Sequence, residues 1–182
     1  AYAEFAPDEA KVPIFLDDPR MIRFRTFSKA YGVAGARIGY GIGNEELIAE
    51  FDKIRNHFGN SLLSQVAAIA AIKDQRYLSE IVKKISLGRE EIYQIAQSNG
   101  LSAIPSATNF VAIDCGKDGK FANQIMNGLL EAKLFVRKPV VAPLDRTIRV
   151  TVGRDEEIDL LKNVLPNVLK ALQVGCITSR LP

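Results

Sequence analysis

Four polar side chains near the N-terminus have the types and the spacing of a reactive site. Lys29 follows the hydroxyl residues Thr26 and Ser28 at the end of an expected strand, and Arg37 comes eight positions later in a glycine-rich turn. A deprotonated lysine amine can attack a carbonyl carbon or move a proton. A guanidinium is a planar, permanent cation that suits a phosphate ester, to which nearby hydroxyls can also donate. The run predicts a lysine nucleophile beside an anion site; a surface lysine and a loop ion pair are the plainer alternative.

A second candidate lies near the other end of the chain, where Arg149 stands inside the apolar run 147–153. An arginine within an apolar strand is costly unless its charge is paired. The position therefore predicts an anionic partner, which is either a ligand or a neighbouring carboxylate.

Composition limits the classes of function. A chain of 182 residues fits one domain, or one and part of another. The net charge is only +3, and no basic run is longer than Lys83-Lys84, so we expect no nucleic-acid partner. Two cysteines and one histidine exclude a disulfide framework and a multi-histidine metal site. No apolar run approaches the roughly 20 residues of a membrane helix. A reducing, cytoplasmic setting is expected.

The first half of the chain predicts short strands followed by helices. Residues 11–43 have the pattern of strands interrupted by turns, with extended runs at 21–27 and 37–42. Asn44 is a plausible N-cap of a first helix, and Ser61 begins a second. The second helix carries an apolar stripe with alanines between its members, formed by Leu62, Val66 and Ile69.

The sequence pattern of the second half of the chain predicts a long helix followed by a mixture of strands and helices. Residues 76–98 are amphipathic, and Asn99-Gly100 should end that helix. Strands are expected at 109–114, 134–137 and 147–152, and helices at 120–132 and 155–172. Pro166 should kink or split the last helix. We place a domain boundary inside the long helix, which gives domains at 1–85 and 86–172 and a tail at 173–182.

The run from Thr26 to Tyr40 resembles the lysine segment of fold-type I aminotransferases, which use pyridoxal phosphate (PLP), and especially their histidinol-phosphate and aromatic branch. The run 147–153 is similar to the Leu-Arg-Ile-Thr-Val-Gly strand of the same family. The resemblance covers about residues 1–172. It implies an α/β fold: the end of the PLP-binding large domain, with a mixed, mostly parallel sheet, followed by a small α+β domain.

The resemblance also implies roles for the first group of residues. Lys29 would hold the coenzyme covalently and move a proton during catalysis. Thr26, Ser28 and Arg37 would bind the coenzyme phosphate. The start of the chain looks like the tail of the family motif Asp-Glu-Ala-Tyr-x-x-Phe, so Tyr2 would hydrogen-bond the phenolic oxygen of the coenzyme.

By the same resemblance, Arg149 would bind the substrate carboxylate, and Arg137 would contribute to a substrate phosphate site. Asn109 would be a substrate-side or domain-interface residue. The aspartate that would precede Tyr2 in the motif is not in this sequence. The resemblance therefore implies a C-terminal half that works with an N-terminal half in a homodimer.

The implied function is transamination between an amino substrate and a 2-oxo acid such as 2-oxoglutarate. The amino substrate is histidinol phosphate, or an aromatic or other amino acid. A PLP decarboxylase of the threonine-phosphate type shares this branch of the fold and is the first alternative. A non-catalytic, aminotransferase-like sensor domain is the second.

Overall fold

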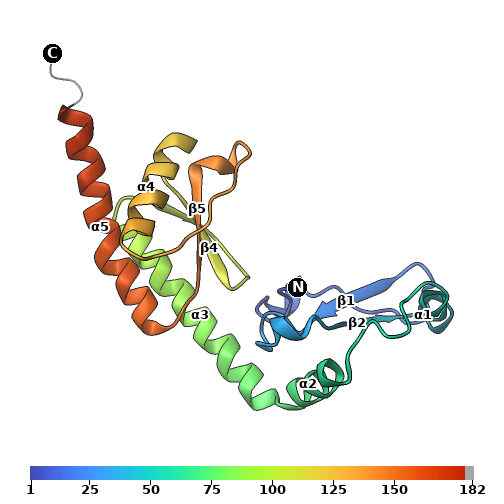
Figure 1. Cartoon of the computed structure of the whole chain (residues 1–182). Coiled ribbons are helices and arrows are strands. Elements are labelled where there is room, and N and C mark those ends of the chain that lie inside the picture. Colours follow the sequence, from blue (N-terminus) through green and yellow to red (C-terminus); the bar gives the residue numbers. More distant parts are fainter. Residues whose placement is uncertain (179–182) are drawn as a thin grey trace. The chain divides into compact units, whose positions relative to one another are not determined.

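The computed structural model describes residues 1–178, and its elements are shown in Figure 1. The chain divides into two compact units, Ala1–Lys84 and Ile85–Pro182. The change from one unit to the next falls within helix α3 (Gln75–Ser98). As expected, helices and strands are mixed in the described residues.

The first unit contains one pair of antiparallel strands. Strand β1 (Ile22–Thr26) pairs with β2 (Gly39–Gly43), so that Thr26 lies opposite Gly39. The connection between them includes a short 3-10 turn, η2 (Ala34–Ala36). Arg37 follows that turn with φ 48°, in the left-handed region. The second extended run therefore begins at Gly39 and not at Arg37, where the sequence pattern indicates its start.

Two predicted helix starts in this unit are confirmed. The Asn44 side chain caps α1 (Glu45–Asp52) by accepting from the backbone N–H groups of its first turn. The Ser61 hydroxyl caps α2 (Leu62–Lys73) by accepting from Ser64 N–H. Such caps satisfy backbone donors that have no partner within the helix. A single 3-10 turn, η1 (Asp8–Ala10), precedes the strands.

The core of the first unit is small and aromatic. Phe27, Tyr31 and Ala68 are buried, and the Phe27 ring centroid lies 5.0 Å from that of Tyr31 and 5.4 Å from that of Tyr40. Helix α2 thus packs here through an alanine. Its expected apolar stripe is exposed, with relative exposures of 74%, 56% and 54% for Leu62, Val66 and Ile69.

The second unit is a three-stranded antiparallel sheet with helices packed on one face. Its strands lie in the order β3-β4-β5. Its elements are the last part of α3, β3 (Ser102–Ile104), β4 (Phe110–Asp114), α4 (Gly119–Glu131), the 3-10 turn η3 (Leu144–Arg146), β5 (Thr147–Thr151) and α5 (Asp155–Thr178).

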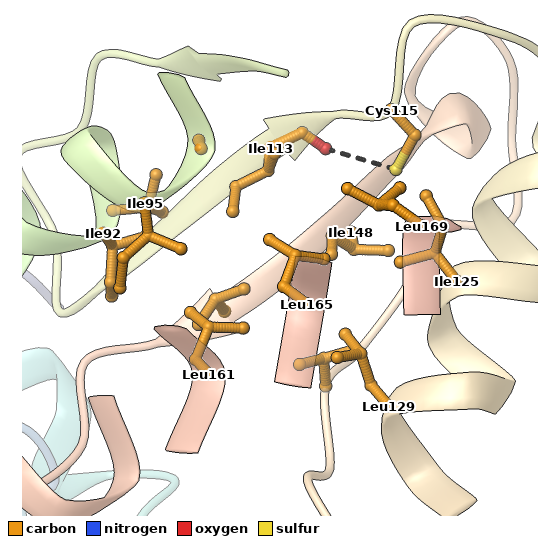
Figure 2. Packing of buried hydrophobic residues seen from close by; sticks show 14 of the residues in the cluster. Ile92, Ile95, Ile113, Cys115, Ile125, Leu129, Ile148, Leu161, Leu165 and Leu169 are labelled. Carbon is orange, nitrogen blue, oxygen red and sulfur yellow. Dashed lines mark hydrogen bonds between the residues drawn. The ribbon is translucent and has the colours of Figure 1, made fainter. Parts of the chain in front are cut away.

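The core of this unit follows from strand alternation. Side chains of alternate residues in β4 and β5 point to one face of the sheet, and this face is covered by α3, α4 and α5. Figure 2 shows these side chains meeting between sheet and helices. The largest fully buried side chains include Val111, Ile113, Ile148, Ile92, Ile125, Leu129, Leu161 and Leu165. The other face of the sheet carries Phe110, Ala112 and Arg149.

All strand pairs in the described residues are antiparallel. The connection between β3 and β4 contains only residues 105–109, which is too short for the crossover that a parallel pair needs. The sequence pattern does not reveal β3, because a strand of three residues is too short to recognise.

Two expectations for the second unit, a strand at 134–137 and a split of the last helix at Pro166, are wrong. The strand expected at 134–137 is reduced to one bridge, Arg137 with Arg149, and Pro139 follows with no N–H to extend a ladder. Helix α5 continues through Pro166 without a break, so it is not split there, and the alternative of a kink stays a prediction. Pro166 lies on the exposed side of α5, while Leu161, Leu165 and Leu169 are buried on the other. Their packing outweighs the local cost of the proline.

Gly88 makes possible the close approach of α3 to Val152, directly after β5, and to α5. A methyl group at Gly88 would lie 2.5 Å from Val152 Cγ1 and 3.1 Å from Ile158 Cδ1. We expect Gly88→Ala to lower the free energy of unfolding by about 1–3 kcal/mol because it overpacks this core. Urea denaturation measures the change, with the exposed Glu90→Ala on the same helix as the control. Equal stability of Gly88→Ala and wild type would contradict this packing.

Candidate functional site

Lys29 lies on a tightly held turn directly after β1. The buried side chains of Phe27 and Ala30 flank it, and its own side chain is exposed. Lys29 C=O accepts from Gly32 N–H at 2.9 Å, and Phe27 C=O accepts from Val33 N–H at 3.1 Å. Gly32 has φ +73°, which a side chain would strain. The turn therefore fixes the backbone of Lys29 and leaves its amine accessible.

Three of the predicted residues form one hydrogen-bond network beside this turn. The Thr26 hydroxyl donates to Ser28 Oγ at 3.0 Å and accepts from Ser28 N–H at 3.1 Å. Arg37 Nη1 donates to Ser28 Oγ at 3.4 Å and to Ala34 C=O at 2.9 Å. Ser28 Oγ thus accepts twice, so its own proton can be donated to an anion. The arrangement combines a fixed cation with a hydroxyl donor.

Tyr2 lies beside Lys29. Lys29 Nζ is 5.8 Å from the centroid of the Tyr2 ring, within the range of a cation–π contact. Tyr2 C=O accepts from Phe5 N–H at 3.0 Å, and Phe5 is buried. The N-terminal turn is therefore held in place by packing, which keeps Tyr2 next to the lysine.

Tyr31 supports the turn that carries Lys29. Tyr31 is buried, and burial raises the pKa of its phenol, with smaller contributions in the same direction from Tyr40 and Glu4. Its phenol therefore stays neutral at neutral pH. Packed on Phe27, it holds the lysine turn against the core.

The second group of predicted residues lies in the second unit, on the open face of the sheet. Arg149 N–H donates to Arg137 C=O at 2.6 Å, and Arg137 N–H donates to Arg149 C=O at 3.2 Å. Side chains of two directly paired residues start from the same face. Two like charges in this position destabilise the pair unless an anion lies between or near them.

The Arg149 side chain has a hydrogen-bond donor, Nε, that lacks an acceptor among the described residues. Among the described residues, its Nε is buried without a hydrogen-bond partner. Its Cζ lies 4.7 Å from the centroid of the Phe110 ring. A buried, unsatisfied donor costs about 1–3 kcal/mol, so the chemistry of this position favours an anionic ligand. The alternative of a carboxylate ion pair has no support in the described contacts of Arg149.

Asn109 stands just before β4 and is half-buried. Its C=O accepts from Val152 N–H at 2.9 Å. The backbone of Asn109 therefore extends the β4–β5 pairing by one residue, and the role of its side chain stays a prediction. The sequence pattern assigns nothing to the next residue, Phe110, although it is aromatic and lies diagonally across from Arg149. Only the strand register reveals that relation.

Other reactive side chains are poor candidates. Burial raises the pKa of the Cys115 thiol to about 11, so it is protonated at neutral pH. Within residues 1–178, no group of three or more His, Cys, Asp or Glu side chains is placed to hold a metal ion. The helices of this part of the chain include none that is both long and apolar enough to cross a membrane.

Comparison with known proteins identifies the family. Residues 1–165 match the family model for aminotransferase class I and II. A histidinol-phosphate aminotransferase of Geobacillus sp. (strain WCH70) is 38% identical over 177 residues, which cover 96% of this chain and 48% of that protein. The crystal structure of histidinol-phosphate aminotransferase from Sinorhizobium meliloti in complex with pyridoxal-5'-phosphate is 51% identical, with a TM-score of 0.90 over 94% of this chain and 48% of that one.

The fold is also found in a decarboxylase. L-threonine-O-3-phosphate decarboxylase from Porphyromonas gingivalis has a TM-score of 0.73 at 22% identity, over 93% of this chain and 53% of that one. This likeness concerns the fold alone. The chain spans about half the length of the curated relatives it matches. On the match of its first 165 residues, the chain belongs to the class I and II aminotransferase family.

Proposed function

We propose that this chain is the lysine-bearing part of a PLP-dependent aminotransferase that acts on histidinol phosphate and a 2-oxo acid such as 2-oxoglutarate. One observation carries the proposal: Lys29 is held exposed on a rigid turn beside the Thr26–Ser28–Arg37 network. A nucleophilic amine and a phosphate-binding set are thus supplied by one short segment.

The residues of this segment fit PLP. A phosphate dianion needs a cation and oriented donors, which Arg37 and Ser28 provide. An aldehyde needs an accessible amine, which Lys29 provides. Tyr2 lies next to that amine, where its hydroxyl can donate a hydrogen bond to the phenolic oxygen of the coenzyme. When bound, PLP acts as an electron sink that makes the α-proton of an amino substrate acidic.

The side chains then have separate tasks. Arg37 and Ser28 hold the phosphate and so fix the position of the coenzyme, and Thr26 orients Ser28 by donating its hydroxyl proton to Ser28 Oγ. Lys29 Nζ is the base that takes the α-proton from the amino substrate, and it returns a proton when the 2-oxo acid becomes an amino acid. The rigid turn at Gly32 limits the positions that the amine can reach.

The open face of the second unit supports an anionic substrate. Arg137 and Arg149 start from the same face, and Arg149 Nε has no partner among the described residues. The phosphate of histidinol phosphate and the carboxylates of 2-oxoglutarate are both suited to guanidinium forks. The similarity to histidinol-phosphate aminotransferases from two organisms supports this substrate over a decarboxylase or sensor function. A homodimer and a cytoplasmic location are part of the same proposal.

The substrate proposal is tested with a chimera in which this chain replaces the matching segment of the Sinorhizobium meliloti relative. The chimera should transaminate histidinol phosphate with 2-oxoglutarate. Arg137→Ala should raise the KM for histidinol phosphate by about 10- to 100-fold, since a hydrogen bond to a charged group contributes roughly 1.5–3 kcal/mol. Steady-state kinetics with histidinol phosphate and with a plain aromatic amino acid measure the selectivity.

The exposed Arg154→Ala in the same unit is the control and should change neither KM. Equal losses for the two donors in Arg137→Ala would favour the broader aminotransferase alternative. A chimera that binds PLP but transfers no amino group from any of these donors would contradict the proposed function.

A further inference from the structure

We infer that Phe110 is a positioning residue, whose ring holds the Arg149 guanidinium ready for an anionic substrate group. This rests on the proposed function of Arg149. The contact itself is direct: Arg149 Cζ lies 4.7 Å from the Phe110 ring centroid. The family resemblance implies no role for Phe110.

The strand register explains why these two side chains meet. Arg149 pairs directly with Ala112, and Phe110 pairs with Thr151, so Phe110 and Arg149 are diagonal neighbours on one face. Diagonal residues are within reach of long and aromatic side chains. Ala112 is small, so the stem of Arg149 passes the directly opposite position without obstruction.

Both partners have fixed backbones. The Ser106 and Thr108 hydroxyls donate to Phe110 C=O at 2.6 and 3.1 Å, and Thr108 Oγ1 accepts from Phe110 N–H at 3.2 Å. Arg149 is bonded to Arg137 on one side and lies opposite Ala112 on the other. The ring and the arginine stem therefore start from positions that vary little.

A ring orients a guanidinium without consuming its donors. The cation–π contact uses the flat face of the guanidinium, and the N–H groups all lie along its edge. A carboxylate in the same place would accept from those N–H groups and cancel the charge. With Phe110, Arg149 keeps its charge and its edge, and its Nε is buried without a partner among the described residues. The geometry prepares an edge-on, two-pronged contact with a phosphate or carboxylate.

The test compares Phe110→Leu, Phe110→Tyr and Phe110→Trp in the same chimera. Phe110→Leu should raise the KM for histidinol phosphate and for 2-oxoglutarate about fivefold, the usual size of a partly desolvated cation–π contact. Its kcat and the absorption spectrum of its bound coenzyme should stay near wild type. Tyr and Trp keep a ring face and should restore both KM values.

The chain offers a matched control in a second cation–π pair. Lys117 Nζ lies 4.3 Å from the Phe121 ring centroid in the same unit. Phe121→Leu removes a ring of the same kind, and both KM values should remain at wild type. A rise as large as that of Phe110→Leu would mean that loss of packing, and not of positioning, is being measured, which would overturn the inference.

A second readout does not depend on catalysis. In the 182-residue chain, the Arg149 Nε–H resonance should carry a ring-current shift that Phe110→Leu removes. Titration with inorganic phosphate should show about fivefold weaker binding to Phe110→Leu than to wild type. If the unmutated chimera is an active transaminase and its Phe110→Leu variant has unchanged KM values, the inference fails and the proposed function stands. If the unmutated chimera binds PLP but transfers no amino group, the proposed function fails, and the phosphate titration alone decides: weaker binding supports the role of Phe110, and equal binding overturns it.

Discussion

Lys29→Ala should abolish transamination by the chimera, with kcat lowered by roughly 10⁴-fold or more, because it removes the group that moves the proton. The fold should be unaffected. Phe27 and Ala30 carry the packing of this turn, and the Lys29 side chain is exposed. The measurements are kcat for histidinol phosphate and the urea midpoint of unfolding. Lys29→Arg keeps the positive charge without a titratable amine and should be equally inactive.

The identity of the lysine can be established chemically. Borohydride reduction of the coenzyme-loaded protein should fix PLP on Lys29, and peptide mapping locates the modified residue. Lys53 is an exposed lysine of the same unit, paired with Glu50, and Lys53→Ala should retain both the adduct and turnover. An adduct mapped to a lysine other than Lys29 would remove the central part of the proposal.

Arg149→Ala should weaken the binding of every anionic substrate. Arg137→Ala, in contrast, should weaken the binding of histidinol phosphate selectively. Truncating one partner of a buried charge pair costs about 2–5 kcal/mol, which is roughly 30- to 4,000-fold in kcat/KM. The loss should appear in both halves of the reaction, since the phosphate of the donor and the carboxylate of the acceptor need the same fork. Arg149→Lys keeps the charge but not the fork geometry and should recover only part of the loss.

Stability distinguishes this substrate role from a structural one. The buried Arg149 Nε has no partner among the described residues, so its removal deletes an unsatisfied donor. The free energy of unfolding of Arg149→Ala, measured without added anions, should therefore not fall. A marked loss of stability together with unchanged kcat/KM would indicate a structural arginine and contradict the substrate role.

The features that could be predicted from the sequence are local ones. The helix starts at Asn44 and Ser61 depend on a side chain and the next few backbone N–H groups. The Thr26–Ser28–Arg37 network is likewise contained in one short segment, and its residue types and spacing are enough to predict that these side chains meet; the anion site itself stays a prediction.

The features that could not be predicted depend on contacts distant in the sequence. The contact of Phe110 with Arg149 follows from the β4–β5 register, and no pattern near either residue encodes that register. The single bridge between Arg137 and Arg149 likewise depends on how segments distant in the sequence pair, which no local pattern encodes. Pro166 shows the opposite case: the local rule that a proline can split a helix is overridden by the burial of Leu161, Leu165 and Leu169.

Arg37 has a conformation that selection for folding alone would not favour. It holds φ 48°, a region that costs a non-glycine residue roughly 1–2 kcal/mol. Glycine would relax this turn, but it would remove the guanidinium that reaches Ser28 Oγ. The strained backbone thus places a trade-off between stability and activity at one position. Selection for resistance to heat alone would favour glycine at position 37. Selection for retention of the proposed coenzyme would favour arginine.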